Sequence, residues 1–164
     1  MAAMTALERN PEKATAAHVL RRLTMAPQLD RVERHAGQSI DDIAATLFDD
    51  ETIRRHTEAD PPSEGRSGDD DEDRELNTDD VVAWWLEQMT AQDSGIVDRM
   101  AWFWHGHLTT NSDKVDSAEL VSEQLITLRR QGLGNFRTLL NDVVTGGAML
   151  RYLDASYSEA SNPN

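Results

Sequence analysis

Two histidines separated by one glycine are the residues of this sequence best suited to chemistry. His105 and His107 can ligate a divalent metal, and Asp113 or Asp116 can supply a carboxylate ligand. On a continuous helix, side chains two residues apart point about 200° apart, so both rings reach one ion only if Gly106 ends the helix. The alternative is structural, because an imidazole at a helix C-terminus can bond backbone carbonyls and suits the negative end of the helix dipole. The sequence favours the structural role and leaves the metal site open.

Aromatic residues gather around the same motif. Such a cluster is compatible with a ligand pocket or a sugar platform, but helical spacing predicts that Trp85 and Phe103 are core residues. One tryptophan of each neighbouring pair then lies near the surface. We therefore expect a seam, formed by Trp84 and Trp104, that packs against the rest of the protein or against a partner helix.

Several reaction types lack their sequence signatures. The chain has no cysteine, which excludes disulfides, thiolate metal sites and a cysteine nucleophile. A glycine-rich phosphate loop and a Gly-x-Ser-x-Gly elbow are both missing, and no spacing of Ser, His and Asp singles out a triad. The sequence thus assigns no catalytic residue, and it leaves open whether the protein is an enzyme.

The charge of the chain limits its partners. Its 30 acidic and 16 basic residues give a formal net charge of −14. An acidic surface repels phosphate backbones and anionic lipids, so we expect neither nucleic acid nor a membrane as partner. No apolar run is long enough to span a bilayer and no export signal is evident, which makes the cytoplasm the default compartment.

Helices must position these residues. Apolar residues recur at helical spacing, as in Val82, Trp85, Leu86 and Met89, whereas no useful length alternates with period two. Residues that favour helix starts precede such stripes, namely Asn10, Ser39, Thr78, Ser117 and Asn135. The pattern predicts an all-α protein, an irregular bundle of about seven or eight helices with one disordered acidic insertion.

The composition divides the chain into four segments. Residues 1–56 and 78–154 are expected to be helices of one domain, and 155–164 a polar tail. Between the helical segments, residues 57–77 hold nine acids but only two arginines and one leucine, which predicts a disordered linker or insertion. A cation-buffering role of the acidic run at 69–73 is the alternative to a solvated spacer.

The block WFWHGHLTT at residues 102–110, followed by Asp113-Lys114-Val115, resembles a motif of a large bacterial family known as domain of unknown function 1800. Four further matches occur in the same order: AHVLRR at 17–22, the tryptophan pair at 84–85, GLGNFR at 132–137 and MLRYLD at 149–154. The resemblance covers most of the chain outside the acidic segment. It implies the same helical fold, and the family carries no settled activity to transfer.

Two departures from the family pattern shape the functional hypothesis. The turn at Thr24–Pro27 lacks the glycine usual in the family, and members usually continue past a segment like the one at 162–164. We therefore expect an N-terminal fragment that acts as a structural or interaction module, with the missing C-terminal portion or a partner helix as its partner. The alternative is part of a metal-assisted hydrolase with His105 and His107 as ligands.

Overall fold

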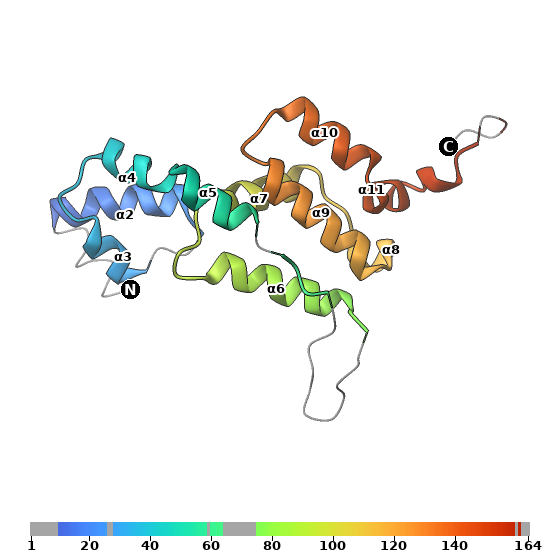
Figure 1. Ribbon diagram of the computed structural model, residues 1–164, viewed down its shortest axis with the longest axis horizontal. Coiled ribbons are helices and arrows are strands. Elements are labelled where there is room, and N and C mark those ends of the chain that lie inside the picture. Colours follow the sequence, from blue (N-terminus) through green and yellow to red (C-terminus); the bar gives the residue numbers. More distant parts are fainter. Residues whose placement is uncertain (1–9, 26–27, 59, 64–74, 160, 162–164) are drawn as a thin grey trace, which may run out of the picture. The chain divides into compact units, whose positions relative to one another are not determined.

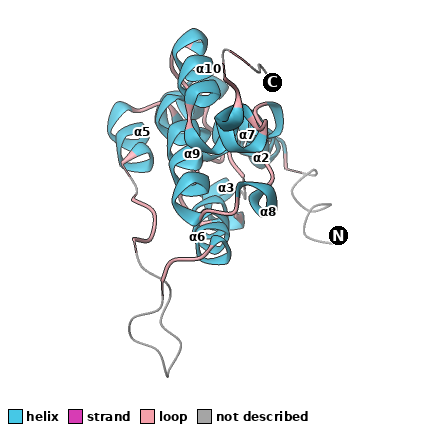
Figure 2. Ribbon diagram, turned by 90° about the vertical axis from the view of Figure 1, so that its right-hand side faces the viewer, coloured by secondary structure: helices cyan, strands magenta, loops and turns pink. Residues whose placement is uncertain are grey.

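The structure, a computed structural model, describes residues 10–25, 28–58, 60–63, 75–159 and 161. Ten α-helices and one 3-10 helix form its regular structure, and these residues contain no β-strand (Figure 2). The helices are α2 (Pro11–Leu23), α3 (Leu29–Arg34), α4 (Ile40–Leu47), α5 (Asp50–Thr57), α6 (Thr78–Thr90), α7 (Ile96–His107), α8 (Ser112–Val115), α9 (Ala118–Gln131), α10 (Phe136–Thr145), α11 (Gly147–Tyr152) and η1 (Ala155–Tyr157). The all-α prediction is confirmed, with a few more helices than expected.

Side-chain caps explain why most helices begin where they do. The Asn10 side chain accepts from the backbone N–H groups of Glu12 and Lys13, and Ser39 caps α4 through Asp42 N–H at 3.1 Å. Ser117 and Asn135 cap α9 and α10 in the same way. These four helix starts were correctly predicted, because a cap needs only the residues within one turn of it.

The predicted start of α6 is wrong by one residue. Asn77 is the cap: its side chain accepts from Asp80 N–H at 3.0 Å, and the Asp80 carboxylate accepts from Asn77 N–H at 3.1 Å. Thr78 is instead the first residue of the helix. This reciprocal capping box satisfies two backbone donors, whereas a cap at Thr78 offers no such exchange.

Two short helices explain why the sequence predicted too few helices. α5 is polar, begins where Asp49 accepts from Thr52 N–H at 3.0 Å, and buries His56 as its one fully buried residue. α8 is a single turn that ends at Asp116 in the left-handed conformation, with φ of 48°. Neither carries the apolar stripe by which a helix is detected in sequence.

The described helices form two compact units. Unit 1 comprises residues up to 57 with 88–99, and unit 2 comprises 58–87 with 100–161, so α6 and α7 contribute residues to both. In unit 1, α2 packs against α3 and α4 (Figure 1). Its core contains Ala16, Ala17, Val19, Leu20, Val32, Ile43 and Leu47. The core of unit 2 contains Ala101, Leu128, Leu139, Val143 and Met149. That 1–56 and 78–154 form one domain stays a prediction.

Part of the acidic segment cannot be compared with its prediction. Residues 59 and 64–74, which include the acidic run at 69–73, lie outside the described residues, as do 160 and 162–164 of the tail. On the described side, α5 extends to Thr57 and α6 starts at Thr78. Disorder of the segment and its cation-buffering role therefore stay predictions.

Candidate functional site

The histidine pair lies on one uninterrupted helix. α7 continues through Gly106 to His107, so the break that would let both rings converge on one ion does not occur. His107 Nδ1 lies 3.1 Å from the carbonyl oxygen of Phe103, one turn earlier, which is the helix-end contact expected of a structural histidine. Asp113 lies on α8. Among the described residues, no three His, Asp or Glu side chains are grouped as metal ligands.

His105 packs among aromatic rings. Its imidazole lies 4.7 Å from the ring of Trp85 and 6.3 Å from that of Trp102, measured between centroids, and the two indoles are 5.6 Å apart. Burial lowers the pKa of His105, because the charged imidazolium loses hydration there. The side chain therefore behaves near neutral pH as an uncharged aromatic group in an apolar cluster.

The four tryptophans differ from the expected arrangement. Trp85 is buried, as predicted, but so is Trp84, which is only 7% exposed and carries the Arg129 guanidinium 5.6 Å above its ring. The expectation that Trp84 lies at the surface is thus wrong. Neighbouring helical residues point about 100° apart, and α6 has partners on both sides, with α9 at Trp84 and α7 at Trp85. Trp102 is instead the most exposed, at 49%.

Two further aromatic residues of α7 complete this comparison. Trp104 is half-buried, donates its indole N–H to the Gly132 carbonyl at 2.8 Å, and stacks on Phe136 at 5.3 Å. Phe103, predicted to be core, is 45% exposed and contacts the His107 ring at 4.3 Å. A seam formed by Trp84 and Trp104 with a partner stays a prediction, although Trp84 offers it little surface.

A groove of about 380 Å³ opens beside the His105 cluster, entirely within unit 2. Its lining comes from α6, α7, α9 and the start of α8: Val82, Trp85, Leu86, Trp102, His105, Thr110, Asn111, Ser112, Val121 and Leu125. Three of its apolar side chains remain well exposed, Val82 at 38%, Leu86 at 50% and Trp102 at 49%. The indole N–H of Trp85 is buried, and no described residue accepts its hydrogen bond. The groove is therefore an apolar surface with one unsatisfied donor.

Comparison with known proteins agrees with the motifs. The model of the family described as "Protein of unknown function (DUF1800)" matches residues 18–164, which is most of the chain. The chain belongs to the DUF1800 family. The resemblance inferred from the WFWHGH block is confirmed, and the matched region includes every residue that lines the groove. Neither a curated protein nor a solved structure matches this chain.

A further property of the helices in this DUF1800 chain concerns their length and apolar character. Across the described ranges, none of the helices combines the length and the apolar character that crossing a bilayer requires. That result agrees with the absence of a long apolar run in the sequence.

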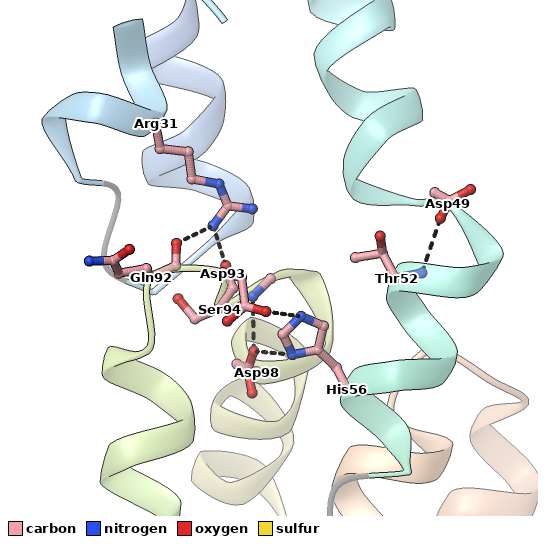
Figure 3. A network of polar contacts seen from close by, with 9 residues as sticks. Arg31, Asp49, Thr52, His56, Gln92, Asp93, Ser94 and Asp98 are labelled. Carbon is pink, nitrogen blue, oxygen red and sulfur yellow. Dashed lines mark hydrogen bonds and ion pairs between the residues drawn. The ribbon is translucent and has the colours of Figure 1, made fainter. Parts of the chain in front are cut away.

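Unit 1 contains a buried polar network that sequence analysis missed (Figure 3). His56 of α5 is 7% exposed, with Nδ1 3.5 Å from Asp98 Oδ2 and Nε2 3.9 Å from Asp93 Oδ2. Asp98 is fully buried and also accepts from Gly95 N–H at 2.8 Å, which caps the first turn of α7. No local signal marks His56, because the partners that bury it lie about forty residues further along the chain.

This network lacks the connections of a hydrolytic triad. Ser94 lies beside it, but its hydroxyl is fully buried and no described residue bonds to it. A serine nucleophile needs a hydrogen bond to its base and access to substrate, and Ser94 has neither. The network ties α5 to the first turn of α7, which is a structural task.

The lowered pKa of His105 predicts a pH dependence of stability. Its ordinary value is 6.5, and burial in the folded state brings the pKa below that. The unfolded chain then binds more protons between the two values, so this histidine costs stability as the pH falls below about 6.5 and has no effect well above it. From about pH 7.5 to about pH 5.5, the wild type should lose more unfolding free energy than His105→Gln in urea titrations.

His107→Gln is the control, because it makes the same substitution on the exposed end of the same helix. Because it keeps His105, it should retain the loss of unfolding free energy between the two pH values that burial of His105 causes. If the wild type and His105→Gln lost the same unfolding free energy between the two pH values, burial would not be holding the His105 imidazole neutral.

Proposed function

We propose that this chain is an interaction module and that the unit 2 groove binds the apolar face of a helix with basic flanks. One observation carries the proposal: three exposed apolar side chains line the same groove, namely Val82, Leu86 and Trp102. Isolated apolar residues are common on protein surfaces, but an apolar groove that several of them line favours a binding role.

The walls of the groove favour a helical occupant. Val82 and Leu86 are one turn apart on α6, and Val121 and Leu125 are one turn apart on α9. Rows with this spacing receive the i, i+3 and i+4 anchors of an amphipathic helix. Burying each such anchor contributes about 1.5–3 kcal/mol before the entropic cost of association is subtracted, so affinity requires several anchors to bind together.

Charge determines which helices fit. The chain carries −14, so a partner with lysine or arginine flanking its apolar face is attracted and an acidic one is repelled. The polar part of the lining, Thr110, Asn111 and Ser112, is uncharged and imposes no contrary preference. Since the partner is identified by chemistry alone, both a separate protein and a further part of the same protein satisfy the proposal.

Two synthetic amphipathic peptides test it. Both present the same leucine face, and the polar face is lysine in one and glutamate in the other. The lysine peptide should bind with a change in tryptophan fluorescence, because Trp85 and Trp102 line the groove. Leu86→Lys should weaken that binding at least about tenfold by placing a charge in the apolar contact.

Leu133→Lys is the matched control, since Leu133 is 38% exposed and does not line the groove. It should bind the lysine peptide as the wild type does. Equal weakening by both variants would show that the added charge, and not the groove, controls binding. Equal binding of both peptides would show non-specific hydrophobic association. Either result would reject the groove as the site.

The alternative of metal-assisted hydrolysis through His105 and His107 stays a prediction. No arrangement of the described residues favours it, because α7 is continuous through Gly106 and the pair gains no third ligand there.

A further inference from the structure

A second pocket, of about 270 Å³, lies within unit 1 and shares no residue with the groove. α3, α4, α5 and the loop before α7 form it, with the lining Arg31, Arg34, His35, Thr46, Leu47, Thr52, Arg55, Gln92 and Asp93. Three arginines against a single aspartate give this lining a formal charge of +2 with His35 neutral. In a chain of net charge −14, such a local excess of cations is unusual.

Arg31 is the fixed element of the pocket. It is 8% exposed, and its Nη1 donates to the carbonyl oxygens of Ser94 at 2.6 Å and Gln92 at 3.4 Å (Figure 3). No described residue accepts from its Nε or Nη2, so one edge of the guanidinium is held and the other keeps its donors. A guanidinium held in this way is preorganised to bind an anion with little loss of entropy.

Burial makes the positive charge of Arg31 costly to hold. Burial, and after it repulsion by Arg34, lower the pKa of Arg31, even though Asp93, Asp30 and Asp98 act in the opposite direction. Arg34 contacts Asp30 only at 3.5 Å on the exposed surface, where ion pairs are weak. An anion that accepts hydrogen bonds from this guanidinium would offset part of the cost of its burial.

Arg55 and Thr52 supply a second wall of the pocket. They are three residues apart on α5 and therefore lie on the same helix face. Arg55 is exposed and makes no ion pair with any described residue. The Thr52 hydroxyl likewise has no described partner, since only its backbone N–H is used, by Asp49. These groups can close on a ligand without first breaking an existing contact.

We propose that this pocket binds a small phosphate monoester. Guanidinium groups match the geometry of phosphate oxygens and bind them with charge-assisted hydrogen bonds, and a phosphate dianion matches a lining of +2. The pocket is slightly smaller than the roughly 300 Å³ at which sites for drug-sized ligands begin, which favours a compact metabolite.

Isothermal titration of the full chain with glycerol 3-phosphate, inorganic phosphate and glycerol tests the proposal. The monoester should bind at one site per chain, free phosphate more weakly, and glycerol not at all. Arg55→Gln should weaken the monoester at least about tenfold, because a charged hydrogen bond is lost. Arg137→Gln, which removes an exposed arginine of α10 in unit 2, should leave the affinity unchanged.

Replacing the aspartate that lines the pocket should have the opposite effect on affinity. Asp93→Asn removes a negative charge from the pocket and should tighten the monoester several-fold, whereas Asp113→Asn on α8 should not. Far-UV circular dichroism checks that each variant is folded, and Arg34→Gln replaces Arg55→Gln if that variant is not. Absence of saturable binding overturns the proposal, as does binding of free phosphate alone. Monoester binding that survives Arg55→Gln, or that Arg137→Gln weakens equally, overturns it as well.

Discussion

Replacing Asp98 with alanine should lower the free energy of unfolding by about 3–5 kcal/mol. Asp98 is fully buried, accepts from Gly95 N–H at 2.8 Å and lies 3.5 Å from His56 Nδ1. Alanine removes the acceptor and leaves both of these groups buried without it. The first turn of α7 loses its cap in the same step, and α5 loses its link to that turn. Urea titration followed by far-UV circular dichroism measures the change.

Asp93→Ala is the matched control for this result. Asp93 faces the same histidine, but its side chain is 60% exposed and lies 3.9 Å from His56 Nε2. Because this carboxylate is mostly in contact with solvent, its pair with His56 should contribute at most about 1 kcal/mol. If Asp93→Ala were as costly as Asp98→Ala, burial would not be the cause of the loss and the structural role of the network would be wrong.

Leu128→Ala should destabilise unit 2 by about 3–5 kcal/mol. Leu128 is fully buried on α9 and packs in one core with Ala101, Leu139, Val143 and Met149. Truncation removes apolar contacts and leaves a cavity that three neighbouring helices are too constrained to fill. All four tryptophans belong to unit 2, so their fluorescence during urea unfolding reports on this unit.

Leu133→Ala separates this core effect from a general cost of losing a leucine. Leu133 lies five residues further along and is 38% exposed, so its replacement should cost less than about 1 kcal/mol. Comparable losses in the two variants would mean that Leu128 does not belong to a tightly packed core.

Local sequence determined the secondary structure well. Asn10, Ser39, Ser117 and Asn135 were assigned as caps and do cap their helices, since a cap bonds to N–H groups two or three residues away. The error at Thr78 has the same origin, because both Asn77 and Thr78 are good caps and only the exchange with Asp80 distinguishes them. Short polar α5 was missed for lack of an apolar stripe.

The candidate site was located more accurately than it was interpreted. The WFWHGH block does lie at a cluster of aromatic residues, and His105 takes part in it. The stripe of Val82, Trp85, Leu86 and Met89 was correctly expected on α6, yet Trp85 and Met89 are buried while Val82 and Leu86 are exposed. A repeat of apolar residues reveals an amphipathic face but does not indicate where the neighbouring helix stops covering it.

By itself, the sequence determined the helical class, most helix starts, the family and the acidity of the chain, because each depends on composition or on residues within one turn. Tertiary structure alone decided the burial of Trp84, the pairing of His56 with Asp98 and the presence of Arg31 and Arg55 in one pocket. These arrangements involve residues from different helices, and the packing that brings such helices together leaves no periodic trace in the chain. The groove and the arginine-lined pocket arise at that level, which is why their chemistry was not evident from the sequence.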